Sequence, residues 1–348
     1  MKASVLKANP MPTQLARWFL ERKRPLPWRD NPTPYAVWVS EVMLQQTQAS
    51  VVIPYFHRFM EKFPTVQALA EAPIEEVVKL WEGLGYYSRA RNLHQGARMV
   101  LDQWGGTVPH GKDELLSIKG LGRYTVGAIL SFAFKMKSPA VDGNVARVMS
   151  RYFAVQEDIC QTKTLNRLNQ LTEQFLPDEE PWVVAEALIE LGATVCKKTP
   201  LCENCPIAEG CQAKKLNLET KLPIKKAAAP VTKLTRVVLA IQISGRYVVK
   251  QVEEGQLMAG LYEFPYFEEE MVESVESLIW EKFGYKAAVF RELPTVQHSF
   301  TRYRAELQPY LVIITKGKAP NGYQLVTLEE AEALPFSSGH KRILSLLS

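Results

Sequence analysis

The sequence predicts a mostly helical domain followed by a smaller α+β domain. In the first half apolar residues recur at three- and four-residue spacing, as in Leu15, Trp18 and Phe19, which is the period of amphipathic helices. Proline and glycine interrupt these segments more often than β-branched runs do. At 348 residues the chain also exceeds the length at which one core usually keeps growing, so two domains are expected.

The second half has the pattern of strands and turns. Short β-branched or alternating runs occupy 237–241 and 310–314, with a turn at 244–245 and a helical segment near 271–283. We therefore expect a smaller α+β domain over 237–348.

A basic segment separates the two halves. Between 212 and 236 one acid, Glu219, stands against seven basic residues: Lys214, Lys215, Lys221, Lys225, Lys226, Lys233 and Arg236. Its prolines and its lack of an apolar period favour a linker over 214–236, which leaves 1–213 as the first domain. Such a linker is either simply solvated or follows the phosphates of a nucleic acid.

Composition indicates where in the cell the protein is expected. No window approaches the run of about 18 apolar residues of a membrane helix, and no apolar leader with a cleavage site opens the chain. We expect a soluble, cytoplasmic protein. Four of the five cysteines lie within 196–211, which favours a metal site in a reducing compartment over disulfides. The fifth, Cys160, is interpreted as a small buried apolar residue.

A glycine-rich turn at 115–128 is the strongest local signal of the helical half. An apolar helix is expected to end at Gly120 and Gly122, and a second helix to start at once. The backbone N–H groups at that helix start would form an anion site. A tight turn between helices needs glycine in any case, so the turn alone is a weak signal.

The cysteines stand at a spacing that allows a metal site. Cys196, Cys202, Cys205 and Cys211 are separated by five, two and five residues. Four thiolates on one short loop can bind an iron-sulfur cubane or a tetrahedral zinc ion, and the spacing alone leaves both open.

A third region places polar residues in an apolar segment. If 38–48 is one helix, Glu41, Gln45 and Gln48 form a polar stripe at i, i+4 and i+7. Periodicity alone favours a stripe that faces solvent.

Taken together, these segments closely resemble the adenine DNA glycosylase (MutY) family of the endonuclease III superfamily. The resemblance spans most of 12–211 and rests on the turn and cysteine segments together with 26–29, 38–48, 81–89, 141–145 and 186–192. It implies a helix-hairpin-helix glycosylase of two helical subdomains with an iron-sulfur loop at 196–211, holding a 4Fe-4S cluster. The first cysteine gap is one residue shorter than is usual in the superfamily. It also implies a bacterial, nucleoid-associated monomer that acts on double-stranded DNA.

The chemistry of such an enzyme needs two carboxyl groups in different environments. Glu41 is the candidate acid toward the purine, because burial can raise a glutamate pKa to about 6–7. Asp142 is the candidate anion that stabilises positive charge on the sugar. The alternative is a turn or helix-capping aspartate beside Gly143, and one residue can play both parts. By resemblance, Asn144 orients Asp142 or water, and Tyr124 and Glu186 shape the acid-base network.

Tyr124 stands where the bifunctional members of the superfamily carry a lysine nucleophile. A tyrosine cannot form an imine, so we expect base removal without efficient strand cleavage, with Lys119 or Lys135 as sources of weak lyase activity. The adenine must be flipped out of the stack. By resemblance the DNA-binding residues are Gln46 and Tyr86, which fill the gap, together with Gly120, Gly122, Arg29 and Arg89.

The second domain resembles the Nudix-like (MutT-like) domain of the same family. Its segment 260–265 precedes a helix at 273–284 that lacks the paired glutamates of a Mg²⁺ site, so pyrophosphate hydrolysis is not expected. The resemblance implies recognition of 8-oxoguanine opposite the adenine, through the loop that contains His298, Phe300 and Thr301. Thr301 replaces the serine of the family's pattern, and Arg302 replaces its final histidine.

Two other functions compete with this interpretation. One is a bifunctional pyrimidine glycosylase-lyase, which Tyr124 and the Glu41 segment disfavour. The other is a non-catalytic iron-sulfur protein that binds DNA, in which Glu41 and Asp142 would be structural.

Overall fold

The computed structural model describes residues 10–226, 230–253, 255–256, 258–268, 274–286, 289–300 and 302–348. The chain divides into two compact units, Met1–Glu71 with Gln95–Ala227 and Ala72–His94 with Ala228–Ser348. This division differs from the expected boundary at residue 213, because the second unit takes in Ala72–His94 and the first extends to Ala227. Within the described part of the chain, no helix combines the length and the apolar character needed to cross a bilayer.

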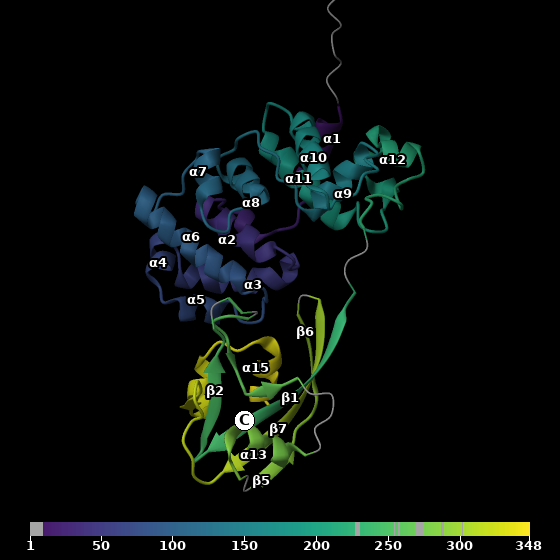
Figure 1. The fold of residues 1–348 in the computed structure, drawn as a ribbon. Helices are drawn as coiled ribbons and strands as arrows, with labels where there is room; N and C mark the ends of the chain where they lie inside the picture. Colours follow the sequence, from purple (N-terminus) through teal and green to yellow (C-terminus); the bar gives the residue numbers. More distant parts are fainter. Residues whose placement is uncertain are drawn as a thin grey trace, which may run out of the picture. The chain divides into compact units, whose positions relative to one another are not determined.

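The first unit is built from helices, as expected (Figure 1). They are α1 (Met11–Arg22), η1 (Pro27–Arg29), α2 (Pro34–Leu44), α3 (Ala49–Lys62), α4 (Val66–Glu71), α7 (Lys112–Ser117), α8 (Arg123–Ala128), η2 (Ile129–Ala133), α9 (Gly143–Tyr152), α10 (Thr162–Phe175), α11 (Pro181–Thr194), η3 (Cys202–Asn204), η4 (Ala208–Gly210) and α12 (Gln212–Lys215). Helix α6 (Ser88–Trp104) begins in the segment assigned to the second unit, where α5 (Ile74–Leu80) also lies.

The core of this unit forms where α1 and α9 pack against α11, and α2 against α3 and α8. Leu15, Trp38 and Phe59 are almost completely buried there. The starts of α2 and α11 follow from their sequences, because each has proline at its first position, where the missing N–H would lack a helical partner. Thr33 also caps α2 by accepting a hydrogen bond from the Ala36 N–H at 3.1 Å.

Helix α2 is shorter than the single helix over 38–48 that the predicted polar stripe needs. It stops at Leu44, and Gln46 has φ of 60°, in the left-handed region that ends a helix. Gln48 instead precedes the first turn of α3. The predicted stripe of Glu41, Gln45 and Gln48 on one helix is therefore wrong, and Glu41 alone belongs to α2.

The glycine-rich turn adopts the predicted form. Helix α7 ends at Ser117, α8 begins at Arg123, and Gly122 occupies the N-cap position of α8. Gly120 has φ of 86°, which a residue with a Cβ rarely adopts. Both glycines are exposed.

Two predictions near the linker are wrong. Residues 214–236 are not one connection, because α12 extends to Lys215 and the first strand begins at Thr232. Between them Leu222 is 3% exposed, and Ile224 accepts a hydrogen bond from the Ile159 N–H at 3.0 Å, so this stretch packs on the helical unit. Cys160, expected to be buried, is exposed in the turn that precedes α10.

The second unit contains a mixed sheet. Its elements after the linker are β1 (Thr232–Ile243), β2 (Arg246–Gln251), β3 (Tyr262–Glu263), β4 (Tyr266–Phe267), α13 (Val275–Phe283), β5 (Val289–Glu292), β6 (Val296–Phe300), β7 (Tyr303–Ile314), β8 (Gln324–Val326), α14 (Leu328–Ala333) and α15 (Ser338–Leu344). The main strand order is β3-β2-β1-β7-β5. Strands β1 and β7 pair in parallel along their full length, whereas β1 and β2 form a hairpin. Its turn at Ser244 and Gly245 has positive φ at both residues, as a tight hairpin requires.

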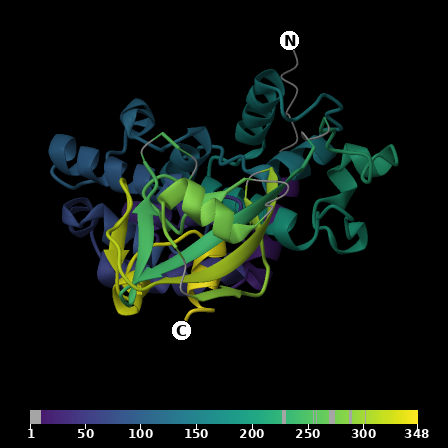
Figure 2. The same ribbon diagram turned by 60° about the horizontal axis from the view of Figure 1, so that its bottom comes forward.

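Alternation along β1 buries both faces of the sheet. Val238 and Ala240 belong to a core that includes Ile343 of α15. Leu239 and Ile241 point to the other face, into a core that includes Leu278 of α13. Figure 2 shows α13 lying across the strands on that face. The expected α+β fold of the second half is confirmed.

Candidate active site

Glu41 is a carboxylic acid held inside the helical unit. It lies on α2, whose other side chains are almost all apolar, and it is 4% exposed. The hydroxyl of Tyr124, from α8, donates a hydrogen bond to Glu41 Oε2. Tyr124 therefore reaches Glu41 because the glycine turn starts α8 beside α2.

The surroundings of Glu41 favour its protonated form. Burial raises the pKa of Glu41 to about 7, assisted by the negative charges of Asp142 and Glu186. The Tyr124 hydrogen bond and the positive charge of Arg29 act in the opposite direction. A carboxyl with this pKa can hold a proton near neutral pH and release it to a substrate.

Asp142 has a different environment. It is the N-cap of α9, where Oδ1 accepts from the Val145 N–H at 2.7 Å and Oδ2 accepts from Asn144 Nδ2 at 2.8 Å. Burial holds the pKa of Asp142 above its usual value, and the hydrogen bonds from Val145 and Asn144 offset only part of this rise. The helix-capping interpretation is thus confirmed, and the Asn144 side chain donates a hydrogen bond to the capping carboxyl.

Arg29 forms ion pairs with two glutamates of α11. Its Nε donates to Glu186 Oε2 at 2.9 Å, and its Nη2 donates to Glu190 Oε2 at 2.9 Å. The side chain of Arg29 is 11% exposed and that of Glu186 18%. Arg29 was expected to bind DNA, but these contacts place it inside the carboxylate cluster.

Sequence reasoning missed Glu190 and Arg24. Glu190 follows Glu186 by one helical turn on α11, so the two carboxyls share a face. A second acid at i+4 in an apolar helix was the available signal. Arg24 Nε donates to Glu190 Oε1 at 2.6 Å.

Tyr86 lies in the loop between α5 and α6, and Arg89 lies in the first turn of α6. Tyr86 is 42% exposed and has φ of 50°. Arg89, by contrast, is 8% exposed and donates through Nη2 to the carbonyls of Leu84 and Gly85 at 3.2 and 3.0 Å. Arg89 therefore supports this loop, while Tyr86 and the exposed Gln46 present side chains to solvent.

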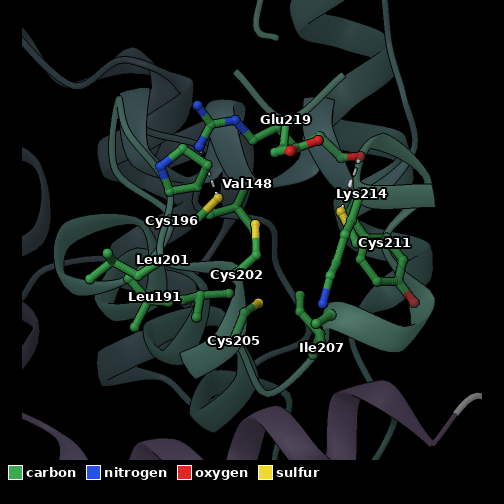
Figure 3. Close-up of a pocket in the computed structure, with 15 residues that line it drawn as sticks. Val148, Leu191, Cys196, Leu201, Cys202, Cys205, Ile207, Cys211, Lys214 and Glu219 are labelled. Atoms are coloured by element: carbon green, nitrogen blue, oxygen red, sulfur yellow. Dashed lines mark hydrogen bonds between the residues drawn. The ribbon is translucent and has the colours of Figure 1, made fainter. Parts of the chain in front are cut away.

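The four cysteines surround one pocket after α11 (Figure 3). Apolar side chains line the space between the sulfur atoms: Val148, Leu191, Leu201 and Ile207. Burial raises the pKa of the Cys205 thiol to about 12, and the other three cysteines add to this effect. Among the described residues, no three His, Cys, Asp or Glu side chains converge on a single metal-ion position.

Two arginines of α9 hold the cysteine loop. Arg151 is 2% exposed and donates to the carbonyls of Lys197 and Lys198 at 2.6 and 3.0 Å, and to Cys196 Sγ at 3.3 Å. Arg147 donates to the Cys196 carbonyl at 2.8 Å. The loop is thus attached to the helix that Asp142 caps.

Two of the predicted lesion-recognition residues, His298 and Phe300, lie on β6. His298 is 8% exposed, its Nδ1 lies 3.0 Å from Ser338 Oγ, and its ring lies 5.0 Å from that of Phe300. Burial lowers the pKa of His298 to about 4, helped by Arg342 and Arg236. His298 therefore supports Phe300 as a neutral ring. Thr301 lies outside the described residues.

Comparisons with known protein families and solved structures match both halves of the chain. Residues 39–174 match the HhH-GPD superfamily of base excision DNA repair proteins, and 236–346 match the NUDIX domain family. The chain is similar to a trapped endonuclease III-DNA covalent intermediate, with 27% identity and a TM-score of 0.52 over 60% of this chain and 95% of that one.

Curated relatives narrow the family. The adenine DNA glycosylase of Rattus norvegicus is 46% identical over 57% of this chain, a match that spans 40% of the rat protein's length. The adenine DNA glycosylase of Buchnera aphidicola subsp. Baizongia pistaciae is 31% identical over 84% of this chain and 83% of its own length. This protein therefore belongs to the adenine DNA glycosylase family.

Proposed function

We propose that the protein hydrolyses the bond between adenine and deoxyribose in duplex DNA where adenine is mispaired with 8-oxoguanine or guanine. The observation that carries this proposal is the pair of unlike carboxyls. Glu41 is buried beside Tyr124 with a pKa of about 7, whereas Asp142 accepts hydrogen bonds at both oxygens. Glycoside hydrolysis needs this division between an acid and an anion.

Protonated Glu41 donates its proton to the flipped adenine, which makes the base a better leaving group. Positive charge grows on the sugar as the bond breaks, and the Asp142 carboxylate stabilises it. Water then supplies the hydroxyl of the abasic sugar, and its proton replaces the one that Glu41 lost. Asn144 keeps Asp142 oriented through its 2.8 Å hydrogen bond.

The same geometry favours a monofunctional enzyme. Burial raises the pKa of Tyr124 well above its usual range, and its hydroxyl is already engaged with Glu41. A phenol cannot form an imine with the sugar aldehyde, so Tyr124 tunes the acid instead of attacking. Borohydride trapping of a covalent complex in amounts equal to base release would contradict this part of the proposal.

The cysteine loop fits a 4Fe-4S cluster. In a cubane each thiolate binds a different iron, so the ligands surround a volume instead of meeting at one point, as they do around zinc. The arrangement of Cys196, Cys202, Cys205 and Cys211 around an apolar pocket supports the former. A bound cluster would cross-link the loop, and Lys197, Lys198, Lys214 and Lys215 would then face DNA phosphates.

We assign reading of the opposite base to the second unit. Its helix α13 carries Glu276 and Glu281 but no paired glutamates, so a Mg²⁺-dependent hydrolase site is not supported. Phe300, held by His298, is a stacking surface next to Thr301 in sequence. Base stacking on an aromatic ring is worth about 1–3 kcal/mol. Because stacking tolerates any base, Phe300→Ala should slow adenine release from both the 8-oxoguanine and the guanine substrates by about tenfold, and Phe290→Ala on β5 is the matched control.

The decisive test of the activity is Glu41→Gln. Loss of the acid should reduce single-turnover adenine release by about 10²–10⁴-fold while DNA affinity is retained. Glu61→Gln, on the exposed face of α3, is the matched control. A Glu41→Gln enzyme within threefold of wild type would refute the assignment of the acid. Duplexes with adenine opposite 8-oxoguanine, guanine or thymine, assayed with and without alkali, separate base release from strand cleavage.

A further inference from the structure

Glu190 is a buried charge that the mechanism above does not use. It is 0% exposed and accepts from both nitrogens of the Arg24 fork, Nε at 2.6 Å and Nη2 at 3.1 Å. Arg29 Nη2 donates to the same carboxylate at 2.9 Å. Burial acts to raise the pKa of Glu190, but the two arginines outweigh it and hold that pKa below its usual range. A carboxylate buried in this way is retained only with close partners.

Arg29 connects this carboxylate to the acid site. Its three donor nitrogens each have a different acceptor: Nε has Glu186, Nη2 has Glu190, and Nη1 has the Arg24 carbonyl at 3.1 Å. Since a guanidinium is planar, fixing two of these contacts sets the direction of the third. The contacts to Glu190 and Arg24 therefore determine where Arg29 meets Glu186.

The charges of Arg29 and Glu186 both change the pKa of Glu41. Arg29 lowers the pKa of Glu41 and Glu186 raises it. The other groups that face Glu41 are Tyr124 from α8 and Asp142 from the start of α9. Lys135, after η2, interacts with Glu186. Among these charges Arg29 is the one whose position depends on Glu190.

We propose that Glu190 is a positioning residue for the acid site, which anchors the guanidinium of Arg29 so that it holds Glu186 and lies close enough to Glu41 to balance its negative neighbours. Glu190 reaches no substrate atom in this role, and Arg24 is the second cation that keeps it ionised. The proposal rests on the proposed function, because it assumes that Glu41 is the acid.

The test compares pH profiles of single-turnover adenine release. Activity that needs protonated Glu41 falls as pH rises through its pKa, which gives an alkaline limb. Arg29→Met removes a cation that lowers this pKa, so the limb should move to higher pH. Glu190→Gln should move it in the same direction by a smaller amount and slow the maximal rate by about tenfold, since small misplacements in an active site are costly. Glu173→Gln, on the exposed side of α10, should change neither quantity.

The double variant Glu190→Gln/Arg29→Met provides the decisive comparison. If Glu190 acts through Arg29, the double variant should match Arg29→Met alone, because coupled residues are not additive. Additive effects, or an unmoved limb in Glu190→Gln, would overturn the proposal and leave Glu190 a residue of stability only.

Two further variants test the proposal when Glu190→Gln does not fold or when the acid itself is in question. If Glu190→Gln does not fold, Glu190→Asp keeps the charge but is too short to hold both arginines, and it should show the same direction of shift. Glu41→Gln separates the two hypotheses. If it stays active, the proposed acid is wrong; if it is inactive while the Glu190 variants leave the limb unmoved, only the present inference fails.

Discussion

Glu41 and Glu190 are both buried glutamates in helices of the same unit, yet their environments oppose each other. Glu41 has a phenol and two carboxyls as neighbours with one arginine, and burial raises its pKa to about 7. Glu190 has two arginines within hydrogen-bonding distance, and its pKa is lowered. Burial alone therefore does not make a glutamate an acid catalyst. The charges packed around it decide whether it holds a proton or a negative charge.

The largest expected effect is the loss of folding stability in Glu190→Gln. Glu190→Gln leaves two arginines without their shared carboxylate, and breaking a buried ion pair typically costs about 3–5 kcal/mol. Because Arg24 is partly exposed, the loss should lie at the lower end of that range. Urea unfolding at pH 7.5 measures it, with Glu173→Gln as the control. A loss below about 1 kcal/mol would show that this carboxylate contributes no more than a surface ion pair.

Glu41→Gln should have the opposite effect on stability. The pKa of Glu41 is near 4.5 when unfolded and about 7 when folded, so folding stability falls as pH rises between these values. Replacing Glu41 by the neutral amide removes that dependence. At pH 8 the variant should be more stable than wild type by about 3 kcal/mol, an upper value from the pKa difference.

The pH dependence provides the control for this prediction. Below about pH 4.5 Glu41 is protonated in both states, and the stability difference between the variant and wild type should become small. For Glu190 the sign is reversed: its contribution is present above about pH 4.5 and is lost as pH falls below that value. A Glu41→Gln enzyme that is less stable than wild type at pH 8 would contradict the comparison.

The smallest expected effect is that of Tyr124→Phe. The Tyr124 hydrogen bond lowers the pKa of Glu41, so its removal should move the alkaline limb of adenine release to higher pH. A hydrogen bond to a charged group is worth about 1.5 kcal/mol, which corresponds to about one pH unit. Tyr35→Phe, whose hydroxyl donates to the Phe63 carbonyl at 2.9 Å, tests whether loss of any buried hydroxyl has this effect. A limb that moves to lower pH would mean that Tyr124 raises the pKa of Glu41.

Local patterns in the sequence determined much of this molecule. Apolar spacing and β-branched runs predicted a helical half and an α+β half, and the glycines at 120 and 122 predicted the turn between α7 and α8. Asp142 as a helix cap and the hairpin at 244–245 also followed from short-range chemistry. Each of these features depends on residues within a few positions of one another.

The tertiary structure alone decided which charges meet. Periodicity suggested that Glu41, Gln45 and Gln48 share a stripe, but Gln46 ends α2 and Glu41 instead faces Tyr124, which lies 83 positions along the chain. Arg24 and Glu190 are 166 positions apart, and no local pattern joins them. A pKa depends on the distances between charges in space, so the sequence could indicate which carboxyls were available, and only the packing of α2, α8 and α11 determined that the pKa of Glu41 is raised while that of Glu190 is lowered.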